Sequence, residues 1–151
     1  MISLFDVSDF SNPTRIREYA EDTKSSSAAQ YDHRAFRYLP QSKLLIVPLY
    51  INTLFYAIKE KEFFDGFVVY NVDESQPFSK KFNISHVSGD DAAKFCWSKN
   101  KLASRSLVFN GQVTTMKGHT VLSHSLDTET YNWGLNLDSG EQHDHCFHWW
   151  L

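Results

Sequence analysis

The chain has 151 residues, a hydrophobic content of 42%, an aromatic content of 15% and a formal net charge of −3. One domain of this length can bury a core, and a weak negative charge without blocks of like charge excludes the electrostatic surface that nucleic acid or anionic lipid would bind. No apolar run approaches the ~20 residues that a membrane-spanning helix needs, and the first ten residues lack the pattern of a secretory signal.

Three stretches share one pattern, in which an alternating apolar strand is followed by an acidic residue, a short polar turn and a second strand. They read ISLFDVSDFSNPTRIREYAED, GFVVYNVDESQPFSKKFNISH and HTVLSHSLDTETYNWGLNL. Asp9, Asp73 and Asp127 occupy the equivalent place, so the spacings are 64 and 54 residues. This loose period is near the ~40 to 50 residues of a propeller blade. We expect each acidic turn to lead from the outer strand of one blade to the inner strand of the next.

Plain hairpins lie between these repeats. In RAFRYLPQSKLLIVPLYI the turn contains Pro40, whose fixed φ suits a turn, and in SRSLVFNGQVTTMK it is formed by Asn110 and Gly111. Asn and Gly tolerate the positive φ that both central positions of a type I′ turn require, and this turn matches the twist of its flanking strands. Both stretches are therefore predicted to be β-hairpins.

Together these units predict an all-β fold, a partial β-propeller of about two four-stranded antiparallel blades plus flanking strands. The domain is expected over residues 1–137, followed by an irregular tail at 138–151. Propellers typically close with about 4 to 8 blades, so the chain is part of a larger propeller, or several copies assemble, or the strands collapse into a sandwich. The predicted strands are 2–8, then 14–20, 34–39, 44–51 and 64–72 in the first round, 79–86, 105–109, 112–117 and 119–126 in the second, and finally 130–137.

Four phrases in this order carry a resemblance to a known family: ISLFDVSDFSNPTRI, YDHRAFRYLPQSKLLIVPL, FDGFVVYNVD and SRSLVFNGQVTTM. The chain resembles, over residues 1–137, the last blades of the C-terminal β-propeller domain of secreted, often membrane-anchored proteins of bacteria and archaea. The resemblance implies an extracellular or cell-envelope location and a larger parent domain. It implies no catalytic residue that could be transferred to a position in this chain.

Asp32 and His33 are the first candidate site. A carboxylate beside an imidazole could orient a general base or contribute to binding, but neighbouring residues on a strand point to opposite faces. We favour a structural interpretation, in which His33 is a buried hydrogen-bonding residue and Asp32 satisfies backbone N–H groups of the preceding turn.

The C-terminal tail holds the densest group of possible metal ligands, which are His143, His145, Cys146 and His148. Imidazole and thiolate suit zinc or copper, although a flexible tail would not preorganise such a site. A disulfide between Cys96 and Cys146 is an alternative in an oxidising compartment, and it would remove one of these ligands.

The acidic turns and one sequon complete the candidate sites. Asp6, Asp9, Asp73, Glu74, Asp127 and Glu129 could present oxygens to calcium, but no EF-hand spacing occurs and turn formation is the favoured interpretation. Cofactors, calcium or zinc included, therefore stay unassigned. Asn83 begins an Asn-Ile-Ser glycosylation sequon within a predicted strand.

Three functional hypotheses follow. The first is a non-catalytic extracellular or cell-surface module that recognises a protein or another ligand, or acts as a scaffold. The second is a metal-dependent hydrolase with its site at the propeller channel, and the third is a structural protein that self-assembles through blade edges. The sequence contains no nucleophile elbow, phosphate loop or metalloprotease motif, which favours the first hypothesis without deciding whether the chain is an enzyme.

Overall fold

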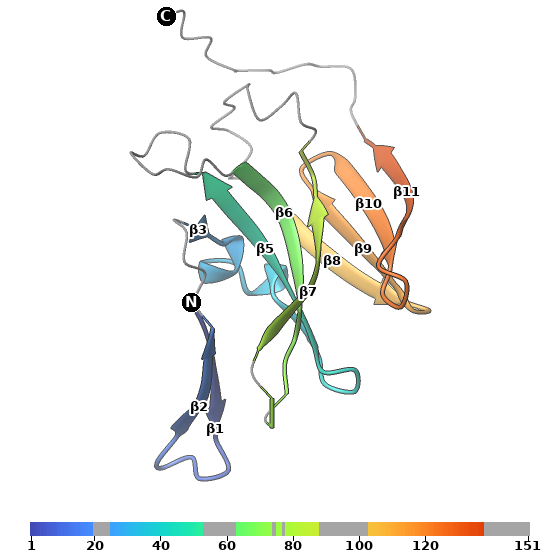
Figure 1. Ribbon diagram of the computed structural model, residues 1–151. Coiled ribbons are helices and arrows are strands. Elements are labelled where there is room, and N and C mark those ends of the chain that lie inside the picture. Colours follow the sequence, from blue (N-terminus) through green and yellow to red (C-terminus); the bar gives the residue numbers. More distant parts are fainter. Residues whose placement is uncertain (20–24, 53–62, 74, 77, 88–102, 138–151) are drawn as a thin grey trace, which may run out of the picture.

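The structure, a computed structural model, describes residues 1–19, 25–52, 63–73, 75–76, 78–87 and 103–137. In these residues the chain forms antiparallel sheets that lie side by side (Figure 1). A hairpin of β1 (Ile2–Asp6) and β2 (Thr14–Tyr19) is followed by a central sheet and then by a four-stranded sheet in the order β11-β10-β9-β8. No helix among the described residues is long and apolar enough to cross a membrane.

The central sheet has β5 and β6 in its middle, β7 at one edge, and the short strands β3 and β4 along the other edge. Its strands are β3 (Ser25–Ser26), β4 (Arg37–Leu39), β5 (Leu44–Asn52), β6 (Phe63–Asn71) and β7 (Ser79–Ser85). The second large sheet consists of β8 (Ser104–Phe109), β9 (Gln112–Lys117), β10 (Thr120–Ser125) and β11 (Tyr131–Asn136). Two turns of 3₁₀ helix, η1 (Ala28–Gln30) and η2 (His33–Ala35), lie between β3 and β4.

The apolar run of β5 is explained by burial on both faces of the central sheet. Leu44 and Ile46 belong to one core cluster, which continues into the β8–β11 sheet through Val113. Leu45 and Val47 belong to a second cluster on the opposite face. A strand buried on both sides carries continuous hydrophobicity instead of alternation, as a strand between two blades must.

Both predicted plain hairpins are confirmed. Leu39 pairs with Leu44 across the turn that contains Pro40, and Phe109 pairs with Gln112 across the second turn. Asn110 and Gly111 adopt φ values of 48° and 70°, which are the positive angles that a type I′ turn requires.

The all-β propeller-like architecture is confirmed, but the predicted grouping of strands is displaced by one strand. The stretch at 14–20 was expected to open the first blade, whereas β2 pairs with β1. The stretch at 79–86 was expected to open the second blade, whereas β7 closes the central sheet by pairing with β6. The predicted strand at 34–39 is also shorter, because η2 occupies His33–Ala35 before β4 begins.

The three acidic turns are equivalent, but they have a different role from the predicted one. Asp9, Asp73 and Asp127 lie in the turns of the β1–β2, β6–β7 and β10–β11 hairpins, so each turn joins two strands of the same sheet. Each large sheet is therefore one plain hairpin followed by one acidic hairpin. The β1–β2 hairpin corresponds to the second half of such a unit.

The central and β8–β11 sheets share an apolar layer. Phe67, Ile46 and Ile84 of the central sheet are fully buried and cluster with Val113 and Leu126 of the other sheet. Gly66 lies so close to the carbonyl oxygen of Ile84 that a Cβ there would collide with it, which keeps β6 and β7 in close contact. The core of the molecule lies between sheets and not inside any one of them.

Replacing Phe67 with Ala tests this layer. Phe67 has no exposed surface, so Phe67→Ala should lower the free energy of unfolding by about 3–5 kcal/mol through lost burial and the cavity left behind. The matched control is Phe10→Ala, because Phe10 is 87% exposed and its loss should change stability by less than about 0.5 kcal/mol. Urea unfolding followed by circular dichroism measures both, and equal effects would contradict the assignment of the core.

Candidate functional site

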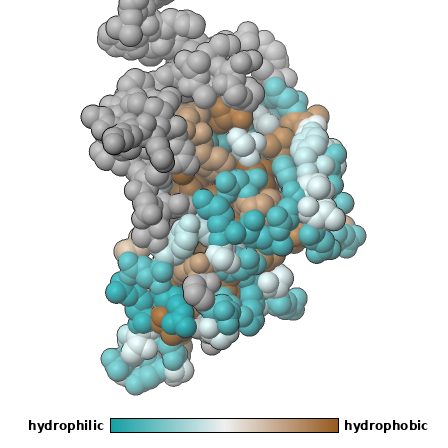
Figure 2. Space-filling model, in the orientation of Figure 1, coloured by the Kyte–Doolittle hydropathy of each residue, from teal (hydrophilic) through white to brown (hydrophobic). Residues whose placement is uncertain are grey.

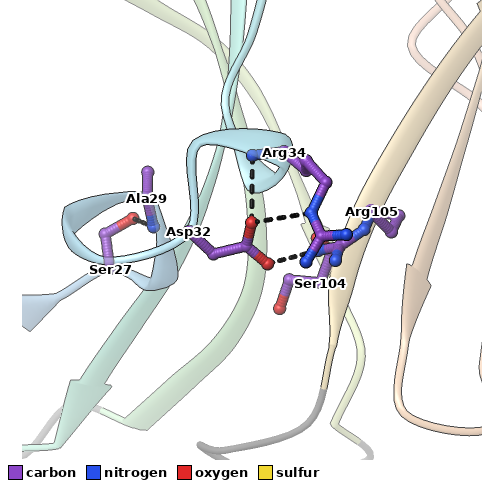
Figure 3. A network of polar contacts seen from close by, with 6 residues as sticks. All are labelled: Ser27, Ala29, Asp32, Arg34, Ser104 and Arg105. Carbon is purple, nitrogen blue, oxygen red and sulfur yellow. Dashed lines mark hydrogen bonds and ion pairs between the residues drawn. The ribbon is translucent and has the colours of Figure 1, made fainter.

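A polar network at η2 joins the β4 edge of the central sheet to the β8 edge of the second large sheet, and these two edges are called the inner edges (Figure 3). Asp32 is the N-cap of η2, and its Oδ1 accepts hydrogen bonds from the backbone N–H and the Nε of Arg34, at 3.0 and 3.3 Å. Its Oδ2 accepts a bond of 2.7 Å from Nη1 of Arg105 on β8, which also donates to the Ser104 carbonyl. One carboxylate therefore caps a helical turn and holds the neighbouring sheet.

The electrostatics of Asp32 agree with this contact. Partial burial would raise the pKa of its carboxyl, but hydrogen bonds from Arg105 and Arg34 and the charge of Arg105 outweigh it and lower the pKa. Asp32 is therefore ionised at neutral pH. A second contact is parallel to the first, since Nε of Arg37 on β4 donates to the Ser106 carbonyl at 2.8 Å.

His33 does not share the environment of Asp32. It lies in η2 with an exposed side chain, so the buried position expected for it is wrong. The N-cap position of this turn is taken by Asp32, whose side chain accepts a hydrogen bond from the Arg34 N–H. A binding role for Asp32 and His33 stays a prediction.

A second polar group is buried between the sheets. Lys117 of β9 and Asp65 of β6 form an ion pair in which both side chains are nearly inaccessible to solvent. Burial lowers the pKa of Lys117 to about 8, and the carboxylate of Asp65 acts against this shift. Such a pair constrains the relative position of two sheets, because displacing either partner would leave an unpaired buried charge.

Two imidazoles, those of His86 and His124, are partly buried. Nε2 of His86 is 2.9 Å from the hydroxyl of Thr115 on β9, while the Nδ1 atoms of His86 and of His124 on β10 are buried without a hydrogen-bond partner. Burial, with a smaller contribution from repulsion by His124, lowers the pKa of His86 to about 4. Burial also lowers the pKa of His124. Both rings are therefore neutral at pH 7 and suit structural packing.

A cavity of about 270 Å³ opens on the other face of the central sheet. Val47, Leu49 and Tyr70 contribute apolar surface to its lining, which also includes Ser25, Ser26 and Ser27. The segment around η1 is fixed there because Oγ of Ser27 donates to the Pro48 carbonyl at 2.5 Å. The remaining lining residues are Met1, Ile2, Ser3, Tyr19, Ala29, Gln30 and Phe36.

This cavity combines features of a small-molecule or side-chain site. Apolar walls provide burial, and a few hydroxyl and amide groups can orient a ligand through hydrogen bonds. Ser3, Ser26 and Gln30 supply such groups from three different segments. Among the described residues that line the cavity there is no histidine, cysteine or carboxylate.

The remaining sequence candidates stay separate from these sites. His143, His145, Cys146, His148 and Cys96 lie outside the described residues, so neither the metal nor the disulfide prediction is tested. Within the described ranges no three histidine, cysteine or acidic residues are placed to hold a metal ion. Asn83 is exposed on β7, and its glycosylation stays a prediction.

The acidic turns use their carboxylates locally. Asp6, Asp9 and Asp73 each accept a hydrogen bond from the backbone N–H two residues further on, at 2.8, 2.9 and 2.9 Å. Asp73 also pairs with Lys43, which lies in the neighbouring β4–β5 turn at the same end of the central sheet. These contacts match the turn-forming interpretation, and Glu74 lies outside the described residues.

The fold and its repeated hairpins define a class of protein built from blade-like antiparallel sheets. A family model described as Beta propeller domain matches residues 1–129, and the chain belongs to this family. Comparisons with curated proteins and with solved structures found no match.

Sequence reasoning missed Arg105, Lys117, Asp65 and the cavity. Asp32 and Arg105 are 73 positions apart, and Lys117 and Asp65 are 52 apart, so no local spacing indicates either pair. A weak signal was available for Lys117 and Asp65, because each is a charged residue within an otherwise apolar or β-branched strand. Charges in such positions are usually paired when buried.

Stability should fall when the pH is lowered from about 6.5 to about 4. The folded state resists protonation of His86, while the unfolded chain takes up a proton near its ordinary pKa of 6.5. The unfolded state therefore binds more protons in this window, and on the order of 3 kcal/mol present above pH 6.5 should be lost by pH 4. His124 adds to the same slope, because burial lowers its pKa as well.

Variants separate this effect from general acid sensitivity. His86→Gln should flatten the dependence of unfolding free energy on pH between 6.5 and 4, measured by urea unfolding at several pH values. His33→Gln is the matched control and should leave the dependence unchanged, because His33 is exposed. An unchanged slope in His86→Gln would contradict the assignment.

Proposed function

We propose that the chain is a non-catalytic recognition and scaffolding module of a β-propeller. The observation that carries this proposal is the cavity beside η1, because its described lining residues combine apolar side chains with serines and include no histidine, cysteine or carboxylate. Its size suits one aromatic or branched aliphatic group, either from a small ligand or from a side chain of a partner protein. The sheets hold this cavity rigidly, since Val47, Leu49 and Tyr70 belong to a packed core face.

Phenol and indole are suitable probes, because they resemble the side chains that such a cavity would bind. Each should raise the midpoint of thermal unfolding in a saturable way, as ligands of the folded state do. Ala29→Trp should fill the cavity and weaken the apparent affinity by at least about tenfold. Ala103→Trp is the matched control, because Ala103 is exposed and does not line the cavity. Equal probe binding by both variants would contradict the proposal.

The hydrolase hypothesis makes a different prediction with the same proteins. Ester, phosphate and glycoside substrates should show no turnover above background with zinc or calcium present. Turnover that disappears in His33→Ala would reject the non-catalytic assignment and favour a site at the inner edge of the sheets. Among the described residues, the contacts of Asp32 do not favour this second function, since Arg34 and Arg105 both bind its carboxylate.

We further propose an extracellular or cell-envelope location, which the family resemblance supports. When cells that produce this protein naturally are kept intact, a membrane-impermeant biotin reagent should label the protein's lysines, including the exposed Lys80. A known cytoplasmic protein serves as the control and should be labelled only after lysis. Protection of this protein until lysis would reject the proposed location.

A further inference from the structure

The outer face of the β8–β11 sheet, turned away from the central sheet, carries exposed apolar side chains beside polar ones, among them Gln112 and Thr114. Alternation along β9 directs Val113 and Thr115 into the core, so the alternate residues of β9, such as Met116, point outwards. The residues of β8 and β10 that pair with these outward positions lie on the same outer face. We define the outer face by six residues, of which four are 46–70% exposed: Leu107, Phe109, Trp133 and Leu135, with Met116 and Val121 between them. Figure 2 shows a surface on which hydrophilic and hydrophobic residues are mixed, and large apolar side chains are also exposed on the β1–β2 hairpin, at Phe5, Val7 and Phe10.

Strand register shows which positions of the central sheet correspond to this face. Counted from the first hairpin of each sheet, Trp133 and Leu135 of β11 occupy the places of Phe82 and Ile84 on β7. Ile84 is fully buried and Phe82 packs beside it, both against the β8–β11 sheet. The outer face therefore repeats, in an exposed position, the β7 part of the surface with which the central sheet contacts its neighbour. At the equivalents of Leu44, Ile46 and Val69 it carries the polar residues Gln112, Thr114 and Ser123.

The same directional contact occurs twice within the chain. Ile2, Leu4 and Tyr19 of the β1–β2 hairpin pack on one face of the central sheet, and the opposite face of that sheet packs on β8–β11. The β1–β2 hairpin thus packs on the central sheet, and the central sheet packs on β8–β11, so each unit contacts the unit that follows it in the chain. At the other end of the stack, alternation along β1 turns Phe5, which is 50% exposed, away from the central sheet.

We propose that the outer face binds the β1–β2 end of a second copy of this chain, so that copies continue the stack head to tail. Two copies would supply four complete sheets and two hairpins, within the range of about 4 to 8 blades that closes a propeller. A head-to-tail contact closes into a ring when its rotation permits. This assembly goes beyond the recognition role proposed above and does not depend on the cavity.

Sedimentation of the full chain over a wide concentration range tests the proposal. The wild-type mass should rise from one copy to two or more, and Trp133→Asp should weaken association by at least about tenfold, because it places a charge in an apolar contact. Tyr31→Asp is the control, because Tyr31 is 74% exposed between η1 and η2 and belongs neither to the outer face nor to the β1–β2 hairpin. Circular dichroism and cooperative unfolding establish that each variant folds.

Mixing two variants identifies the geometry. Phe5→Asp damages the hairpin end and Trp133→Asp damages the outer face, so each alone should stay monomeric. Their mixture should form a one-to-one pair, since one copy keeps an intact outer face and the other an intact hairpin end. A symmetric contact between two outer faces would instead leave Phe5→Asp fully associated.

Four results would overturn the proposal. They are a wild-type chain that is monomeric at every concentration, association that survives Trp133→Asp, association of Phe5→Asp with itself at wild-type strength, and a mixture that forms no pair. Association gained only on deletion of residues 138–151 would show that the chain's own tail occupies the outer face, and it would also reject a second copy as the occupant.

Discussion

The structure depends on the packing of one antiparallel sheet against the next. Every large buried side chain of the first core cluster lies in the layer between the central and β8–β11 sheets, and the second cluster lies between the central sheet and the β1–β2 hairpin. A single sheet of this kind has no interior of its own, so its stability comes from its neighbours. The unit of folding is therefore a pair of adjacent sheets, because apolar side chains are buried where one sheet packs on the next.

Polar contacts fix the relative position of the sheets within this apolar layer. At the inner edges, Asp32 and Arg37 of one sheet system bind Arg105 and the Ser106 carbonyl of the next. At the outer strands, Lys81 of β7 reaches Glu129 in the β10–β11 turn at 2.9 Å. Apolar contacts are non-directional, whereas these bonds have fixed geometry, so they select one arrangement from several that would bury similar area.

The sequence predicted the strands and hairpins well, because each depends on neighbouring residues. Alternation located the strands, and Asn110-Gly111 defined a turn from its own backbone preferences. The grouping into sheets failed by one strand, because a hairpin pattern shows which two strands pair but not where one sheet ends. The same limit applies to the site, since Arg105 meets Asp32 and Lys117 meets Asp65 only through sheet stacking.

Burial on both faces also decides between a propeller sector and a two-layer sandwich. In a sandwich, strands alternate between apolar inward residues and polar outward residues. Leu44 to Val47 are instead all buried, because the central sheet has a neighbour on each side. The outer face of β8–β11 carries Leu107, Trp133 and Leu135 where a terminal sandwich layer would carry polar side chains. The central sheet therefore lies between two neighbours, an arrangement that a two-layer sandwich does not provide.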